Sequence, residues 1–132
     1  MIRSRLSLWG PVVVYMAAIF CLSSLHQAPL PPGLSDKPAH AFGYMGLGFV
    51  IARALGGGLP PRITQRDFVI GFAIAVAYAA SDEFHQRFVP GRYADLADLY
   101  ADAVGSAIAL SACWAWGIIS PRSTQPAARS RQ

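Results

Sequence analysis

Four long apolar stretches make up most of the chain, and short segments rich in proline and glycine separate them. The stretches cover residues 8–25, 37–55, 68–88 and 94–119. Each is close to the ~20 residues that an α-helix needs to cross about 30 Å of hydrocarbon. The segments between them, HQAPLPPGL, GGGLPP and VPG, contain the residues that end helices. The pattern therefore predicts an all-α, polytopic membrane protein, a bundle of four transmembrane helices.

The first stretch has a second interpretation, because a basic start followed by an apolar core is also typical of a secretory signal peptide. Arg3 and Arg5 supply the basic start. No convincing small-residue cleavage site follows near residues 23–28, so we favour an uncleaved first span.

The second stretch carries signals for a helix start and for close packing. Ser35 is expected to cap the helix, with Asp36 in its first turn. Small residues let helices approach one another closely in a bilayer, and this stretch holds Gly43, Gly46 and Gly48.

The composition also favours a membrane protein. Of the 132 residues, 54% are hydrophobic and 14% are charged, against ~25% charged residues in soluble domains. The net charge of +4 is not gathered into a basic run with interleaved aromatics, so the sequence does not support nucleic-acid binding. By length the chain is one domain, expected over residues 1–120, with a disordered cytoplasmic tail over residues 121–132.

The basic residues predict how the helices are oriented. With a cytoplasmic N-terminus, the inner face carries Arg3, Arg5, Arg53, Arg62, Arg66, Arg122, Arg129 and Arg131. The outer face then carries only Lys37, Arg87 and Arg92. This distribution follows the positive-inside rule and places both termini in the cytoplasm.

Polar residues interrupt the apolar pattern between Ser81 and Asp102, in SDEFHQRFVPGRYADLADLYAD. This segment holds five of the seven acidic residues, and a sixth, Asp36, begins the second helix at the same membrane face. Ionisable groups between membrane-spanning segments are costly, so a functional site is the first hypothesis for them. The topology predicts that they line a polar cleft facing outward.

Helical spacing groups these side chains further. Asp82, His85 and Gln86 stand at i, i+3 and i+4 and are expected to share one face of the third helix. On the fourth helix, a stripe at i, i+3 and i+7 consists of Asp95, Asp98 and Asp102. With a rise of about 1.5 Å per residue, Asp102 lies roughly 10 Å deeper than Asp95. Such a carboxylate should face a polar cleft or a cationic partner.

Three kinds of chemistry fit this inventory. Carboxylates and a histidine on facing helices could bind a divalent metal, although no tight motif such as HExxH is present. His85 or Glu83 could act as a general acid or base, and the basic residues of the outer face could hold an anionic headgroup. The candidate catalytic residues are Asp82, Glu83, His85 and Asp98. The candidate substrate-binding residues are Asp36, Lys37, His40, Tyr44, Gln86, Arg92, Asp95 and Asp102.

Several of these positions also have a structural interpretation. Asp36 suits the N-terminal end of a helix dipole, and Asp95 suits a solvated cap. Arg87 and Arg92 suit interfacial anchors or salt-bridge partners. The density of ionisable groups on the third and fourth helices favours function over purely structural roles.

Two motifs resemble those of the VanZ-like family. The string SDKPAHAFGYMGLG resembles the family's SDK-x-x-H-x-x-x-Y-x-x-L-G start, and SDEFHQRFVPGRYADLADLYADAVGSAIA resembles its SDE-x-x-Q-x-F-x-P-G-R core. The similarity covers residues 35–109. By this resemblance the motif residues are Asp36, Lys37, His40, Tyr44, Asp82, Glu83, Gln86, Pro90, Gly91, Arg92, Asp98 and Gly105. Pro90 and Gly91 are expected to turn the chain so that Arg92 and the carboxylate stripe of the fourth helix face the third helix. One departure is Asp102, where the family more commonly has asparagine.

The resemblance implies a small multi-pass protein of the bacterial inner membrane. The family takes its name from a protein associated with low-level teicoplanin resistance, and most relatives have no established activity. We expect a cell-envelope protein that binds an anionic lipid or lipid-linked headgroup at the outward-facing cleft, with modification of the headgroup left open.

The competing hypothesis is a non-enzymatic structural or complex-forming module whose charged residues lock the helices together. Proton-coupled transport is less favoured, because the chain has no inverted repeat. The sequence does not identify a cofactor, and a divalent metal ion stays one candidate. Whether the protein forms a homo-oligomer is also left open.

Overall fold

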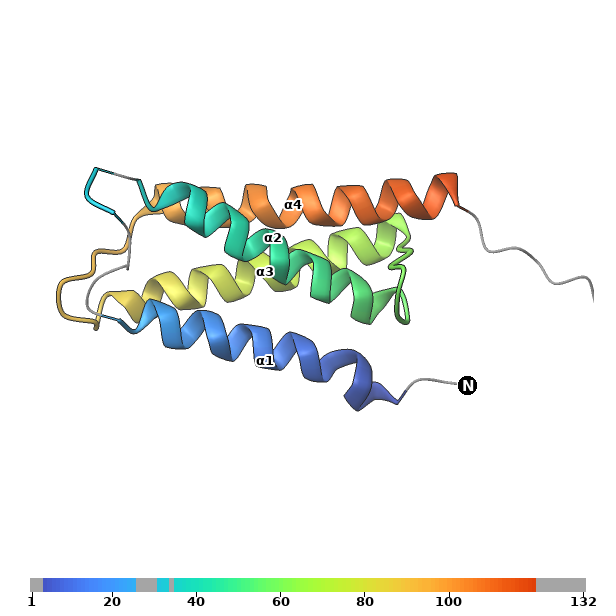
Figure 1. The fold of residues 1–132 in the computed structure, drawn as a ribbon, viewed down its shortest axis with the longest axis horizontal. Helices are drawn as coiled ribbons and strands as arrows, with labels where there is room; N and C mark the ends of the chain where they lie inside the picture. Colours follow the sequence, from blue (N-terminus) through green and yellow to red (C-terminus); the bar gives the residue numbers. More distant parts are fainter. Residues whose placement is uncertain (1–3, 26–30, 34, 121–132) are drawn as a thin grey trace, which may run out of the picture.

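The computed structural model describes residues 4–25, 31–33 and 35–120, and within these ranges it contains four helices and no strand. The helices are α1 (Arg5–Ser23), α2 (Lys37–Leu55), α3 (Gln65–Gln86) and α4 (Leu96–Ile119). They run alternately in opposite directions along the bundle (Figure 1). The prediction of an all-helical fold is thus confirmed. The predicted tail over residues 121–132, and most of the predicted loop over residues 26–34, lie outside the described residues.

Side-chain caps set where three of the helices begin. Ser4 caps α1 and Asp95 caps α4, each by accepting a backbone N–H of the first turn. Thr64 and Asp67 form a capping box at the start of α3, each side chain accepting the other residue's backbone N–H. Because polar residues fill these first turns, α1 and α3 begin before the apolar stretches that predicted them.

The start of α2 differs in detail from the prediction. The capping position is Asp36, whose side chain makes no capping hydrogen bond. Ser35 lies one residue further out, where its hydroxyl accepts the Lys37 N–H at 3.3 Å. The Asp36 carboxylate is therefore free to contact other groups.

α2 is the central helix of the bundle. It contacts α1, α3 and α4, whereas α1 and α4 do not contact each other in the described part of the chain. The approach of α2 to α4 is close because glycine faces backbone: a Cβ on Gly105 would overlap the Ala41 carbonyl oxygen. A Cβ on Gly48 would lie 2.9 Å from the Ser106 carbonyl oxygen.

The other two glycines of α2 behave differently from each other. Gly46 lies against the Tyr15 ring of α1, so a side chain there would clash. Gly43 has no atom within 4 Å of the position a Cβ would take. The prediction of close approach therefore holds for Gly46 and Gly48 and is wrong for Gly43.

The outer surface of the bundle is strongly apolar. Exposed side chains include Leu6 at 81%, Phe42 at 71% and Ile119 at 71%. Among the described residues, α1, α3 and α4 are long and apolar enough to cross a membrane. With 19 residues α2 is about 28 Å long, but it is not among these three apolar helices. That α2 forms the fourth membrane crossing stays a prediction.

Charged side chains are segregated between the two ends of the bundle. One end, called the polar end below, is formed by the end of α1, the start of α2, the end of α3 and the start of α4 (left in Figure 1). It carries all the acidic residues except Asp67. The opposite end carries Arg5, Arg53, Arg62 and Arg66.

Candidate functional site

Four carboxylates are buried at the polar end. They belong to Asp82 and Glu83 of α3 and to Asp98 and Asp102 of α4, and their residues are only 1–7% exposed. The side chain of Gln86, at 2% exposure, lies beside the α3 pair. A buried carboxylate is costly unless it is hydrogen-bonded, ion-paired, protonated or bound to a cation. The groups that contact these four carboxylates therefore define the site.

The Lys37 ammonium group joins the first turn of α2 to the start of α4. Its Nζ lies 3.3 Å from Asp36, 2.8 Å from Asp95 and 2.5 Å from Asp98. Asp95 lies at the surface outside α4, and the Lys37 ammonium holds the pKa of its carboxyl below the ordinary value. These four residues are called the Lys37 cluster below.

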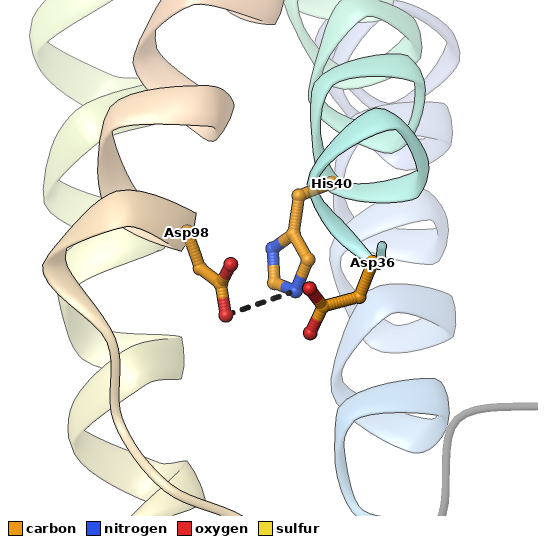
Figure 2. Close-up of side chains that lie close together, drawn as sticks. All are labelled: Asp36, His40 and Asp98. Atoms are coloured by element: carbon orange, nitrogen blue, oxygen red, sulfur yellow. Dashed lines mark ion pairs between the residues drawn. The ribbon is translucent and has the colours of Figure 1, made fainter. Parts of the chain in front are cut away.

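His40 lies one turn further along α2, between the two buried carboxylates of α4. Its Nδ1 lies 2.9 Å from Asp102 Oδ1, and its Nε2 lies 3.7 Å from Asp98 Oδ2. Figure 2 shows the Asp98 contact, with Asp36 on the other side of the ring. Because Asp98 and Asp102 are four residues apart, they project from one face of α4 and can both reach the imidazole.

Hydrogen bonds, rather than ion pairs, satisfy the two buried carboxylates of α3. Glu83 accepts the Asp95 backbone N–H at 3.0 Å and the Gln86 amide at 3.3 Å. Asp82 accepts the Ser23 hydroxyl of α1 at 2.6 Å and the same amide at 3.5 Å. Within the described ranges, neither carboxylate has a lysine, arginine or histidine nitrogen within 4.0 Å.

His85 does not join this group. Its ring lies 4.4 Å from that of Phe20 on α1, and its Nε2 lies 3.1 Å from the Ser24 hydroxyl. It therefore points toward α1, while Asp82 and Gln86 are buried in the bundle. Asp82 also reaches the end of α1, through Ser23, so His85 and Asp82 lie on the same side of α3 as their spacing predicts, and His85 differs in being less buried.

Arg92 follows the turn that joins α3 to α4. Gly91 has a φ of 81°, a left-handed conformation that glycine adopts easily, and the chain turns there. The Arg92 guanidinium then donates to the carbonyl oxygens of Leu25 at 3.0 Å and Leu22 at 3.4 Å. It thus holds the end of α1 and lines the same cavity as Asp82 and Gln86 of α3.

A pocket of about 240 Å³ opens beside the buried carboxylates. Its lining comes from α1, α2, α3 and the loop before α4: Ile19, Leu22, Ser23, Asp36, Ala39, His40, Gly43, Tyr44, Asp82, Gln86 and Arg92. α1 contributes mostly apolar side chains, whereas α3 contributes only polar ones. We call this cavity the polar-end pocket.

One lining residue has an unused polar group. Tyr44 is 2% exposed, and its hydroxyl has no hydrogen-bond partner among the described residues. The hydroxyls of Tyr15 and Tyr78, in contrast, donate to backbone carbonyls at 2.9 Å and 2.5 Å. Leaving a buried hydroxyl unsatisfied costs about 1–3 kcal/mol. The polar-end pocket therefore offers a ligand a buried hydroxyl group.

A larger groove of about 600 Å³ lies between α2 and α4, away from the buried carboxylates. Its lining is almost wholly apolar and includes Phe42, Phe49, Ile108 and Trp116. Such a surface suits contact with acyl chains or another apolar surface.

The structure brings most of the predicted site residues together. Ten of them lie in the Lys37 cluster, around His40 or along the polar-end pocket: Asp36, Lys37, His40, Tyr44, Asp82, Glu83, Gln86, Asp95, Asp98 and Asp102. Sequence reasoning missed Ser23, which is buried, lines the pocket and donates to Asp82. The only signal for it was a serine pair closing an otherwise apolar stretch.

Three apolar helices of membrane-spanning length, packed around buried carboxylates, indicate a helical membrane protein. The family model described as VanZ/LLP1 matches residues 2–119. The chain therefore belongs to the VanZ/LLP1 family, and the resemblance seen in its two motifs is confirmed. Neither the curated proteins nor the solved structures contain a match to it.

Proposed function

We propose that this protein is a cell-envelope membrane protein that binds the anionic headgroup of a lipid or lipid-linked precursor in the polar-end pocket. The observation that carries the proposal is the buried Tyr44 hydroxyl without a partner, in a pocket that is apolar toward α1 and polar toward α3. An amphiphile presents the same pairing of apolar and polar groups. The pocket volume of about 240 Å³ suits a headgroup rather than a whole lipid.

Arg92 is the proposed anion-binding group of the pocket. It lines the cavity, and its contacts to α1 carbonyls use only part of its guanidinium. The remaining N–H groups suit a phosphate or carboxylate oxygen. Lys37 is a weaker candidate, because three carboxylates already surround its ammonium group.

The proposal includes an orientation in the bacterial inner membrane. α2 serves as the fourth span, the polar end faces the extracytoplasmic side and both termini are cytoplasmic. The segregation of Arg53, Arg62 and Arg66 to the opposite end supports this orientation. The pocket would then meet both the outer leaflet and water.

A structural role is the second candidate, and the Lys37 cluster favours it at that position. The ammonium group ties the start of α2 to the start of α4, although its partial exposure to solvent screens these ion pairs. On this view the charges of the cluster hold helices together and bind no ligand.

The variant Tyr44→Phe separates ligand binding from structural stabilisation, because it removes only the hydroxyl. Delipidated protein in detergent is titrated with phosphatidylglycerol, and binding is measured by native mass spectrometry. We expect affinity to fall about tenfold, since a hydrogen bond to a charged group contributes about 1.5–3 kcal/mol. Delipidated Tyr44→Phe should unfold at the same or a higher temperature, because it leaves no unsatisfied hydroxyl.

Tyr100→Phe is the matched control, since Tyr100 is 73% exposed, and it should bind as the wild type does. A parallel titration with glycerol 3-phosphate tests whether the headgroup suffices without acyl chains. Equal phosphatidylglycerol affinity for Tyr44→Phe and wild type would contradict the proposal, and so would a wild-type protein that binds no anionic lipid.

A further inference from the structure

The buried acidic residues of the polar end outnumber the cationic groups that contact them. Lys37 pairs with Asp98, and His40 contacts Asp98 and Asp102. Asp82 and Glu83 are equally buried and, in the described part of the chain, have no cationic partner within 4.0 Å. Hydrogen bonds from Ser23, Gln86 and the Asp95 backbone offset part of the cost of burying them, and a bound metal ion or a proton would offset the remaining cost of the charge. Among the described residues these two carboxylates have no positive counter-charge, which a bound cation would supply.

Two sets of side chains have the spacing to hold a metal ion, and both include His40. In each set the nearest ligand atoms lie within 4.8 Å of one another: Asp36, His40 and Asp98 in one, and His40, Glu83 and Asp102 in the other. The first set, drawn in Figure 2, shares two of its carboxylates with the Lys37 ammonium group. A second cation there would be repelled by Lys37. The second set contains no residue that contacts Lys37.

The two nitrogens of His40 suit the second set. Nδ1 is on the side of Asp102, at 2.9 Å, and Nε2 is on the side of Asp98, at 3.7 Å. A metal-binding histidine usually donates its other ring N–H to a carboxylate, which fixes the ring and its tautomer. Asp98 is the nearest carboxylate on the Nε2 side, and its 3.7 Å contact must shorten by several tenths of an ångström to form that hydrogen bond. Lys37 in turn holds Asp98.

Glu83 can bind a metal without losing its present contacts. Each of its oxygens accepts one hydrogen bond, from the Asp95 backbone N–H and from Gln86. A carboxylate oxygen has two lone pairs, so each oxygen keeps one for a metal ion.

The Tyr44 hydroxyl is an independent sign that a ligand belongs beside this set. Tyr44 is one helical turn after His40 and lines the same pocket. Its buried hydroxyl has no hydrogen-bond partner among the described residues. A water molecule or an anion bound to a metal ion would accept or donate the hydrogen bond that this hydroxyl lacks.

We infer that His40, Glu83 and Asp102 bind one divalent transition-metal ion such as Zn²⁺ or Mn²⁺. One imidazole and two carboxylates suit these ions better than Ca²⁺ or Mg²⁺, which prefer oxygen ligands alone. Three protein ligands leave at least one coordination position open for water or a ligand oxygen. The site goes beyond headgroup binding and does not depend on it, although the ion would let an acidic pocket hold a phosphate.

Metal content is tested on the delipidated full-length protein, so that the result is independent of any lipid. The protein is treated with EDTA, dialysed and titrated with Zn²⁺ and with Mn²⁺ by calorimetry, and bound metal is counted by mass spectrometry. We expect one ion per chain and a rise in unfolding temperature with metal concentration. Glu83→Gln should weaken binding at least about 100-fold, and Asp98→Asn about 10-fold, as expected for a group that orients the histidine.

Asp67→Asn is the control, because it removes one carboxylate at the opposite end of the bundle and should bind metal as the wild type does. Unchanged affinity in Glu83→Gln overturns the inference, and so does a wild-type protein with neither bound metal nor a metal-dependent unfolding temperature. If Glu83→Gln does not fold, infrared spectroscopy of the wild type decides. A protonated carboxylic acid band that persists with metal present means that protons supply the missing charge, and this also overturns the inference.

Discussion

Asp82 illustrates how a single carboxylate is accommodated inside the bundle. It is 4% exposed and has no cationic partner within the described ranges, so hydrogen bonds alone offset its burial. The shorter bond, 2.6 Å from the Ser23 hydroxyl, has the length of a charge-assisted hydrogen bond. A serine at the end of α1 is thus part of the polar site on α3.

The variant Ser23→Ala should therefore be destabilising. It removes the short hydrogen bond to a buried carboxylate, which costs about 1–3 kcal/mol. Thermal unfolding of the delipidated protein in one detergent measures the effect. Ser81→Ala is the control, because Ser81 is exposed and bonds only to the carbonyl of its own helix. An equal, small effect of both substitutions would mean that Asp82 is protonated or otherwise satisfied.

At this scale the sequence predicted some contacts and could not predict others. Asp98 and Asp102 share a helical face, so their joint contact with a group on another helix followed from spacing. The group itself, His40, lies 62 residues away from Asp102 in the chain, and no periodicity encodes such a pairing. The position of Arg92 depends on the turn at Gly91, which spacing on a helix does not describe.

The pairing of α2 with α4 depends on two glycines that face backbone atoms. Gly105 contacts Ala41, and Gly48 contacts Ser106. The same close approach brings His40 of α2 to Asp98 and Asp102 of α4. The geometry of the helix pair and that of the site are therefore linked.

Gly105→Ala should force α2 and α4 apart, because the new Cβ would overlap the Ala41 carbonyl oxygen. Backbone cannot move aside as a flexible side chain can, so we expect a loss of about 1–3 kcal/mol in the free energy of unfolding. Gly43→Ala is the matched control on α2, where a Cβ meets nothing within 4 Å. It should be neutral or stabilising by up to about 1 kcal/mol. Thermal unfolding in detergent compares the two, and equal stability would show that α2 and α4 tolerate a wider separation.

Helix positions were largely predictable, and the deviations have local causes. The bounds of α2 agree with the predicted stretch of residues 37–55. α3 begins at Gln65 rather than at residue 68, because Thr64 and Asp67 close a capping box that hydropathy does not detect. α2 is not among the helices that are apolar enough to cross a membrane by composition, which fits its extensive contacts with α4 and with the other two helices.

For the molecule as a whole, antiparallel packing converts a local sequence pattern into a polarised bundle. The SDK motif begins α2 and the SDE motif ends α3, so the two motifs meet at the polar end (Figure 1). The basic residues before α3 and at the end of α2 meet at the other end. This separation of charge makes the orientation in the membrane testable at two positions.

Cysteine labelling at the two ends tests the orientation directly. Tyr93→Cys lies in the exposed loop of the polar end, and Gln65→Cys lies at the exposed start of α3. Each is placed in a background with Cys21→Ser and Cys113→Ala. A membrane-impermeant maleimide should label Tyr93→Cys in spheroplasts, and Gln65→Cys only after the membrane is opened, because positively charged ends stay in the cytoplasm. The reverse pattern would place the polar-end pocket on the cytoplasmic side, where envelope precursors facing the outer leaflet could not reach it. Only α3 lies between these two positions, so labelling of both in spheroplasts would mean that α3 does not cross the membrane, contrary to the proposed topology.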